Sequence, residues 1–234
     1  AASDVYKRQV RDEWKPLWGK RAVVEDHFNE LVIDLVNPAG QPERMQLVVR
    51  GYNDGFAFCY KIPDGKGPCV NVQSELTAYN FAGDYTAWFY NGENHNIGPE
   101  KLTETDGTRL PVMTVKAGDK HYMAIHEACL ETGAPLVLQS KGGESLFSVA
   151  SKPTSLSPGY TSAWRVVLYG TTPGVLTDSH LLELLNPDPD SRYDFSWVKP
   201  GLAVWDWRIN GAVWDGFTSV SYTHLRAHET CADL

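Results

Sequence analysis

The feature that most constrains the fold is a long series of short runs in which apolar and polar residues alternate, separated by glycine, proline and asparagine. Alternation with a period of two is typical of strands that bury one face, and the separating residues are those that turns favour. We therefore expect a mainly β protein built as a sandwich. The runs expected to form strands are residues 22–24, 30–36, 45–52, 56–62, 69–72, 84–90, 112–115, 122–125, 136–138, 146–149 and 164–169.

The remaining segments give weaker signals. Residues 11–19 are rich in tryptophan and are expected to be irregular and to cover a sheet face. Residues 91–110 are polar, contain several glycines and show no period, so they are expected to form a loop. Residues 177–185 are compatible with a short helix capped by Thr177 or Asp178.

Composition argues against several classes of partner. The sequence has 21 Lys and Arg against 29 Asp and Glu, a formal net charge of −8, and no basic cluster, which argues against nucleic acid. No run approaches the ~20 apolar residues of a membrane span. Between residues 10 and 218 the cysteines are Cys59, Cys69 and Cys129, whose odd number and wide spacing do not indicate a disulfide framework or a zinc site. Cys59 and Cys69 flank an expected hairpin turn, so a bond between them and two free thiols both remain open.

Both ends of the chain resemble translated sequencing-adapter DNA. One coding of residues 4–9 has a reverse complement that encodes residues 220–224 when it is read one base out of frame. Such segments are excluded before the fold is considered, as tags are. We therefore expect residues 1–9 and 219–234 to be non-native tails without fold or function, flanking a fragment of metagenome sequence. The apparent metal cluster of His224, His228 and Cys231 is discarded for the same reason.

The sequence changes character between residues 186 and 217. The segment NPDPD at 186–190 can continue neither a helix nor a strand ladder. After Trp197 and the Lys199-Pro200-Gly201 turn comes a compact apolar run at 202–207, which is typical of a fully buried strand. We therefore expect a domain boundary near residue 197 and the first strand of a second domain after it.

A strand-rich region closed by SWVKPG (196–201) and WDWR (205–208) resembles glycoside hydrolase family 97. Further stretches match in the same order: WKPLWG at 14–19, GYNDGFAF at 51–58, DYTAW at 84–88, IHEA at 125–128 and TSAWR at 161–165. The resemblance implies a galactose-mutarotase-like β-supersandwich at residues 10–197, incomplete at its N-terminus, and then the truncated start of a (β/α)8 barrel at 198–218. It also favours extended chain over a helix at residues 177–185.

Glu127 is the leading candidate for a functional residue. It follows an apolar strand, and a buried carboxylate is costly unless it is paired, hydrogen-bonded or bound to a cation. The resemblance implies that Glu127 is a ligand of a calcium ion at the interface with the barrel, and that calcium is the cofactor of the intact enzyme. The alternative is a structural carboxylate bonded to Arg165 or to backbone amides.

Five further residues are candidates for contact with substrate or with the domain interface. His126 is expected either to orient Glu127 or a substrate hydroxyl, or to be structural. Arg165 is expected at the same interface, or in an ion pair at a strand edge. Asp206, between Trp205 and Trp207, is expected on the first barrel strand, where it faces either the active site or the barrel core.

The resemblance implies an α-glycosidase that hydrolyses α-glucosidic or α-galactosidic bonds in oligosaccharides and works in the periplasm or outside the cell. Its two catalytic carboxylates are expected on later barrel strands, so this chain is expected to contain no catalytic residue and to be inactive without its barrel domain. The alternative is a non-catalytic, mutarotase-like module that binds carbohydrate. A structural adhesion module ranks last, because it would leave the features after Trp197 without a purpose.

Overall fold

The computed structural model describes residues 2–37, 44–65, 69–92, 96–131 and 133–201. The chain divides into two compact units, one made of residues 1–15 and 23–189 and the other of residues 16–22 and 190–234. All strands and helices of the described residues lie in the first unit. That unit ends at Pro189, inside the proline-rich segment that the sequence marks as the approach to a boundary.

The first unit consists of strands with a few short helical segments, as the alternating sequence predicts. Its strands are β1 (Ala2–Trp14), β2 (Val24–Val36), β3 (Arg44–Tyr52), β4 (Gly55–Lys61), β5 (Val70–Val72), β6 (Ala78–Asn80), β7 (Thr86–Tyr90), β8 (Asn96–Lys101), β9 (Thr108–Ala117), β10 (His121–Ala128), β11 (Leu138–Ser140), β12 (Leu146–Val149), β13 (Thr154–Leu156) and β14 (Trp164–Gly170). The helical segments are η1 (Leu102–Glu104), α1 (Pro173–Asp178) and α2 (Leu181–Leu184).

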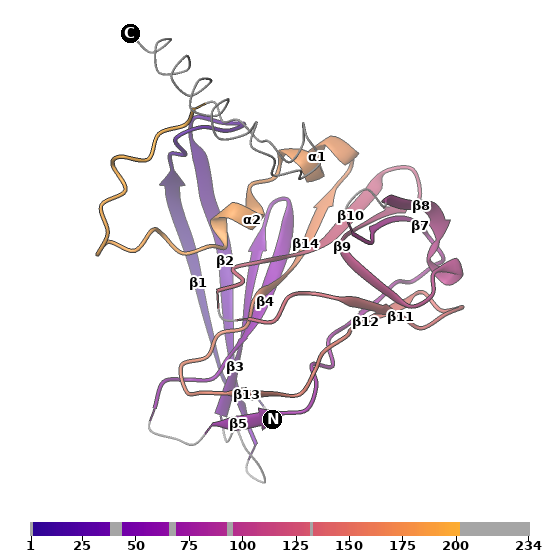
Figure 1. Cartoon of the computed structure of the whole chain (residues 1–234), viewed down its shortest axis with the longest axis horizontal. Coiled ribbons are helices and arrows are strands. Elements are labelled where there is room, and N and C mark those ends of the chain that lie inside the picture. The colour runs from indigo at the N-terminus through magenta and orange to yellow at the C-terminus, as the bar shows by residue number, and fades with distance from the viewer. Residues whose placement is uncertain (1, 38–43, 66–68, 93–95, 132, 202–234) are drawn as a thin grey trace, which may run out of the picture. The chain divides into compact units, whose positions relative to one another are not determined.

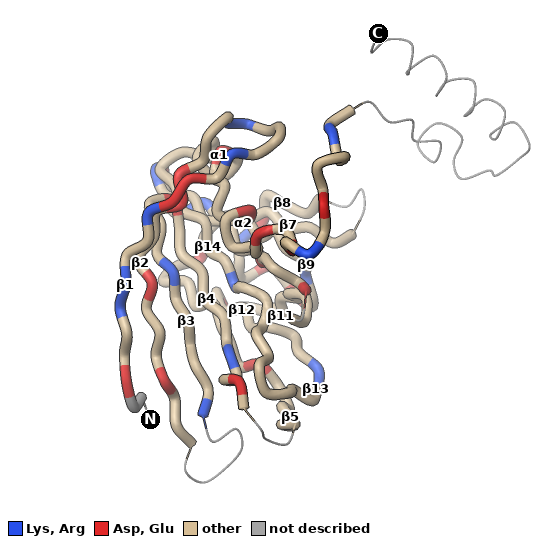
Figure 2. Tube along the Cα trace, turned by 90° about the vertical axis from the view of Figure 1, so that its left-hand side faces the viewer, with Lys and Arg blue, Asp and Glu red and all other residues tan. Residues whose placement is uncertain are grey.

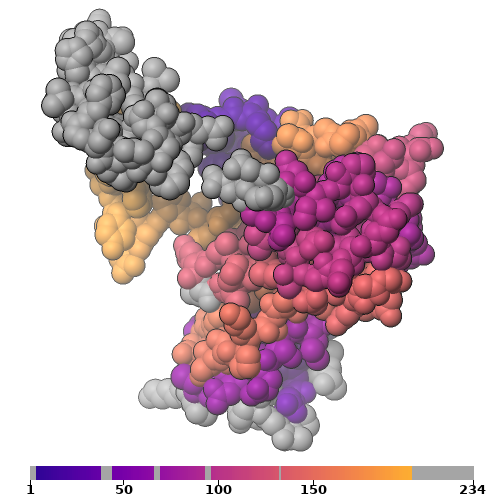
Figure 3. Space-filling view, turned by 45° about the vertical axis from the view of Figure 1, so that its right-hand side comes forward, coloured from indigo at the N-terminus to yellow at the C-terminus, as the bar shows by residue number. Residues whose placement is uncertain are grey.

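One antiparallel sheet runs through most of these strands, in the order β1-β2-β3-β4-β14-β10-β9-β11-β12-β6, and β7 joins it by pairing with β8 and β9. Figure 2 shows the first strands of this order, β1 to β4, and β14 lying side by side. In Figure 1, β7 to β9 lie beyond β10 on the far side from β1. A separate ladder joins β5 to β13, whose atoms pack together at the lower edge of the view in Figure 3.

The central strands β10 and β14 are buried on both faces, and this produces two apolar cores. Side chains alternate between the faces of a strand, so Ala124 and Ile125 enter different cores. The first core joins one face of β3, β4, β10 and β14 to α2, through Val166, Leu168 and Leu181. The second lies between the other face of β10 and strands β7, β9, β11 and β12. This arrangement confirms the predicted mainly β sandwich.

The N-terminal segment corrects one prediction. Residues 1–9 were expected to carry no fold and residues 11–19 to be irregular, but residues 2–14 form β1, paired with β2 along nearly its whole length. The backbone groups on one edge of β2 would otherwise be unpaired, and the backbone of β1 pairs with them. In addition, Arg8 Nε donates to Glu30 Oε1 at 2.6 Å. The non-native origin of residues 1–9 stays a prediction.

Two other segments differ from the sequence-based expectation. Residues 91–110 were expected to be a loop, yet they hold β8, η1 and the start of β9, because β8 pairs with the aromatic strand β7. For residues 177–185 the helix was the correct alternative, but its predicted cap was wrong: the N-cap of α2 is His180, whereas Thr177 and Asp178 end α1. Leu181 of α2 and Leu185 just after it cover the first core. Cys59 and Cys69 are free thiols, the first buried and the second exposed. Among the described residues, no helix is long and apolar enough to span a membrane.

Candidate functional site

Glu127 lies at the end of β10, directly opposite Arg165 of β14. Both side chains point to the face of the sheet that carries the second core, since Ile125 and Val167 alternate with them on that face. The side chain of Glu127 is 10% exposed, and its Oε2 lies 3.7 Å from Arg165 Nη1. The same oxygen accepts a hydrogen bond from the backbone N–H of Leu136. The contacts that the sequence offered as a structural alternative are therefore both present.

Arg165 makes its strongest bonds with a different acid, Glu75. Arg165 Nε and Nη2 donate to the two carboxylate oxygens of Glu75 at 3.0 and 2.7 Å, and Nη1 donates to the carbonyl oxygen of Ala134 at 3.3 Å. Such a bidentate pair is geometrically specific and strong. Because the single positive charge is already matched by Glu75, the three groups together carry one net negative charge, centred on Glu127.

The protonation of this cluster follows from its burial. Burial raises the pKa of the Glu127 carboxyl, and the Leu136 amide and the charge of Arg165 offset only part of that effect. Burial also opposes the charge of Arg165, but the hydrogen bonds and the charge of Glu75 outweigh it and raise the pKa of the guanidinium. Arg165 therefore keeps its proton more firmly than a free guanidinium does, and Glu127 ionises at a higher pH than an exposed glutamate.

His126 points to the opposite face of β10 from Glu127. Its Nδ1 accepts a hydrogen bond from the backbone N–H of Glu127 at 2.8 Å, and burial lowers the pKa of its ring. A histidine that accepts from an amide is held neutral in this geometry. The His126 ring bonds the backbone N–H of Glu127 and so helps to fix the end of β10. The carboxylate of Glu127 contacts Arg165 and the Leu136 amide instead.

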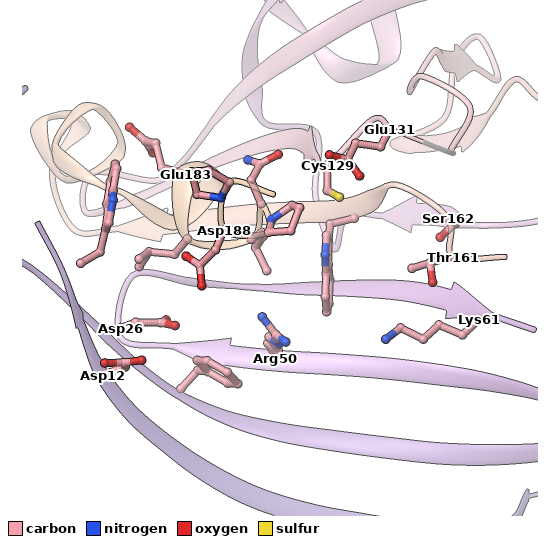
Figure 4. A pocket seen from close by; sticks show the side chains of 18 of the residues that line it. Asp12, Asp26, Arg50, Lys61, Cys129, Glu131, Thr161, Ser162, Glu183 and Asp188 are labelled. Carbon is pink, nitrogen blue, oxygen red and sulfur yellow. The ribbon is translucent and has the colours of Figure 1, made fainter. Parts of the chain in front are cut away.

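A second feature, which the sequence reasoning missed, is a cleft of about 990 Å³ on the other face of the sheet. Strands β1, β2, β3 and β4 supply its floor, and α2 with residues 186–189 closes it above (Figure 4). The cleft contains Asp12, Asp26, Arg50, Lys61 and Trp164 among its lining residues. A signal for it existed in the sequence, because polar Asp26 and Glu30 occupy the same alternating positions of β2 as buried Phe28.

Comparison with known proteins settles the family. A family model described as "Glycosyl-hydrolase 97 N-terminal" matches residues 2–187. The chain belongs to the glycosyl-hydrolase 97 N-terminal family.

Individual relatives agree with this assignment. A "Retaining alpha-galactosidase" of Bacteroides thetaiotaomicron is 27% identical over 199 residues, which cover 68% of this chain and 30% of the relative. A "Probable retaining alpha-galactosidase" of Streptomyces bingchenggensis is 27% identical over 225 residues, 88% of this chain and 32% of the relative. A solved glycoside hydrolase family 97 enzyme from Pseudoalteromonas sp., in complex with acarbose, superposes with a TM-score of 0.73 at 25% identity, over 86% of this chain and 32% of that one. The chain thus spans about a third of the length of these relatives.

The calcium ion implied by the family 97 resemblance can be tested against the donor groups at Glu127. Calcium prefers ~6–8 oxygen ligands. No group of three or more His, Cys, Asp and Glu side chains among the residues with a described position could hold a metal ion. Glu127 Oε2 is engaged by Leu136 and Arg165, which leaves Oε1 as the oxygen able to bind an ion. The residues present therefore fit at most one ligand of a calcium site, and the remaining ligands would have to come from outside the described residues.

The remaining candidates inferred from the resemblance to family 97 are distributed as follows. The structure brings Glu127 and Arg165 together, and His126 lies beside them on the opposite face. Asp206, Trp205 and Trp207 lie outside the described residues, as do residues 202–218 of the expected barrel start, whereas residues 198–201 are described and belong to no strand. Glu75 was missed because it comes from the stretch between β5 and β6, which belongs to no strand and shows no pattern.

Proposed function

We propose that this chain is the N-terminal part of a calcium-dependent α-glycosidase that hydrolyses α-glucosidic or α-galactosidic bonds in oligosaccharides. Membership in the family and the names of two relatives support a glycosidase. The relatives extend over about three times the length that the chain matches, which leaves room for a separate catalytic domain. The partner of this β-sandwich would be its own barrel, and the protein would act in the periplasm or outside the cell.

The observation that carries the proposal is the state of Glu127. Its carboxylate is nearly buried at the end of β10, and its only described cation neighbour, Arg165, is already neutralised by Glu75. A carboxylate held in this way is fixed in position and retains one oxygen for an outside ligand. We assign Glu127 as one calcium ligand, with Arg165 and Glu75 as the groups that hold it in place. When bound, calcium would supply a positive charge that polarises substrate oxygens.

The catalytic carboxylates themselves would come from the barrel, so the chain of 234 residues is expected to be inert alone. Asp206, Trp205 and Trp207 remain predicted members of the first barrel strand. The relatives named as retaining α-galactosidases favour an α-galactosidic substrate and retention of configuration, while the acarbose complex favours testing α-glucosides as well.

The test uses the longer protein that contains this sequence. We expect it to cleave an aryl α-galactoside or α-glucoside in calcium, and to lose that activity when calcium is chelated. Glu127→Gln, which keeps the acceptor for Leu136, should weaken calcium binding measured by isothermal titration without lowering the thermal midpoint. Calcium affinity equal in the two proteins would remove Glu127 from the ligand set, and absence of hydrolysis on both substrate classes would reject the glycosidase.

The second candidate function is a non-catalytic module that binds carbohydrate. The cleft on the face opposite Glu127 is the observation in its favour. The two functions differ in what the chain does alone: a module binds sugar without any other domain, whereas a glycosidase fragment need not. Direct titration of the isolated chain with oligosaccharides separates them.

A further inference from the structure

The cleft contains an arrangement that is unfavourable for the fold by itself. Asp12 of β1 and Asp26 of β2 lie directly opposite each other in the ladder, and like charges in such a pair repel. Oδ1 of Asp26 is buried and accepts no hydrogen bond among the described residues. A buried acceptor without a donor is costly, so this oxygen is a position where a bound molecule could supply the missing hydrogen bond.

Arg50 stands in the middle of the cleft floor with its orientation fixed. Its guanidinium carbon lies 4.4 Å from the ring centre of Phe28 and 4.9 Å from that of Trp164, and Nε donates to Glu30 Oε2 at 2.8 Å. The stacking and the ion pair together hold the planar group in one place. Its side chain is still 21% exposed, so the guanidinium keeps access to the cleft.

The two ends of the cleft differ in chemistry. Figure 4 shows Asp12 and Asp26 close together at one end, and Lys61, Thr161 and Ser162 at the other. The first end offers carboxylate acceptors, and the second offers the Lys61 ammonium group as a donor, since the Ser162 hydroxyl already accepts from the Tyr60 backbone N–H and donates to the Ala163 carbonyl oxygen. Trp14, 39% exposed, adds an aromatic surface beside the acidic end.

These features decide the class of ligand. The lining holds six acidic side chains (Asp12, Glu13, Asp26, Glu131, Glu183 and Asp188) against the basic Arg50 and Lys61, which disfavours an anion. The acids do not form a cluster able to hold a metal ion within the described part of the chain. A neutral molecule with many hydroxyl groups satisfies both ends, because each hydroxyl donates and accepts, and its C–H faces pack on aromatic rings. The volume lies at the upper end of the ~300–1,000 Å³ of ordinary ligand sites.

We propose that this cleft is a carbohydrate-binding site for a neutral oligosaccharide, distinct from the Glu127 cluster. Consecutive residues of β14 separate the two places: Trp164 lines the cleft, and Arg165 on the opposite face holds Glu127. Asp26 and Arg50 bind sugar hydroxyls, and Trp14 packs against a ring. The choice of oligosaccharide as ligand class rests on the proposed function, but binding needs no catalytic group and no calcium.

The test titrates the purified chain with maltotriose and with raffinose, followed by amide chemical shifts and tryptophan fluorescence. We expect saturable binding that perturbs residues of β1, β2 and β3. Asp26→Asn should weaken it at least about tenfold, the loss of one charged hydrogen bond, while the variant folds at least as stably because burial disfavours the charged carboxylate and Arg50 offsets only part of that cost. Trp14→Ala should weaken it as well.

Asp119→Asn is the matched control, since Asp119 is exposed in the turn between β9 and β10 and does not line the cleft, so this variant should bind both sugars as the parent chain does. No saturation by either sugar, or shifts caused by calcium chloride and by no sugar, would overturn the proposal. Binding that Glu127→Gln abolishes and Asp26→Asn leaves intact would also overturn it, because the sugar would then sit at the Glu127 cluster. None of these results bears on hydrolysis by the longer protein. The proposal of a carbohydrate site in the cleft and the proposal of a glycosidase can therefore be rejected independently of each other.

Discussion

Glu127 faces Arg165 across the β10–β14 ladder, yet the guanidinium gives its bidentate bonds to Glu75 and lies 3.7 Å from the Glu127 carboxylate. The two acids therefore share one cation unequally. Glu75 receives two charged hydrogen bonds, and Glu127 receives a backbone amide and a more distant charge. This inequality determines how each member of the cluster responds to substitution.

Replacement of Arg165 by methionine should destabilise the chain strongly. The guanidinium is 2% exposed, and its removal leaves two acids, Glu75 and Glu127, close together without a counter-charge. Breaking a buried ion pair from one side costs about 3–5 kcal/mol in the free energy of unfolding. Urea denaturation followed by tryptophan fluorescence measures the change. Arg192→Met is the control, because Arg192 pairs with Asp190 at the exposed surface and should show no measurable loss.

The raised pKa of Glu127 predicts how stability depends on pH. The Glu127 carboxyl binds its proton more tightly in the folded chain than in the unfolded chain, where its pKa has the ordinary value of 4.5. The bound proton therefore stabilises the folded chain in full below pH 4.5, and this stabilisation is lost as the pH rises through the folded pKa. Glu127→Gln should therefore gain stability relative to the parent as the pH rises from 4 to 7, measured by urea denaturation at each pH. A constant difference between the two proteins across that range would contradict the assignment.

The sequence predicted the part of this architecture that depends on local alternation. The strands β3, β4, β10 and β14 were located within a few residues, because each buries alternate side chains between regular turns. The contact of Glu127 with Arg165 was among the stated alternatives: Glu127 follows one apolar run, and Arg165 stands near the start of another. Glu75 could not be predicted, because nothing local shows that a stretch outside any strand returns to pack against β14.

The cleft is a second feature that the local sequence pattern could not predict. Asp12, Asp26 and Arg50 lie on three different strands, and only the register between β1 and β2 places Asp12 opposite Asp26. Register depends on pairing across the sheet, which one strand's pattern does not reveal. The N-terminal strand was missed for a different reason: its residues alternate suitably, but their likeness to adapter DNA led us to exclude them from the fold.

The cysteines should differ in reactivity. Burial raises the pKa of the Cys59 thiol to about 11, so almost none of it is thiolate near neutral pH, whereas Cys69 is exposed. We expect iodoacetamide to label Cys69 in the folded chain and Cys59 only after unfolding, as shown by peptide mass spectrometry. Cys69→Ser should abolish labelling of that peptide and leave Cys59 protected. Equal labelling of both thiols in the folded chain would mean that β4 is not buried.

Glu30 provides a pH dependence of opposite sign to that of Glu127. Burial opposes its ionisation, but hydrogen bonds from Arg8 and Arg50 outweigh burial and hold the pKa of the carboxyl below its ordinary 4.5. The stability that ionised Glu30 contributes is present above pH 4.5 and is lost as the pH falls through the pKa of Glu30 in the folded chain. Glu30→Gln should cost about 2 kcal/mol at neutral pH, and the difference should shrink in acid. Arg8→Ala, which removes the partner that is 62% exposed, should cost much less than Arg50→Ala, whose side chain is 21% exposed and also stacks on Phe28. If the two arginine variants were equally destabilised, β1 would hold Glu30 as firmly as β3 does, and the exposure of Arg8 would be a poor guide to its energy.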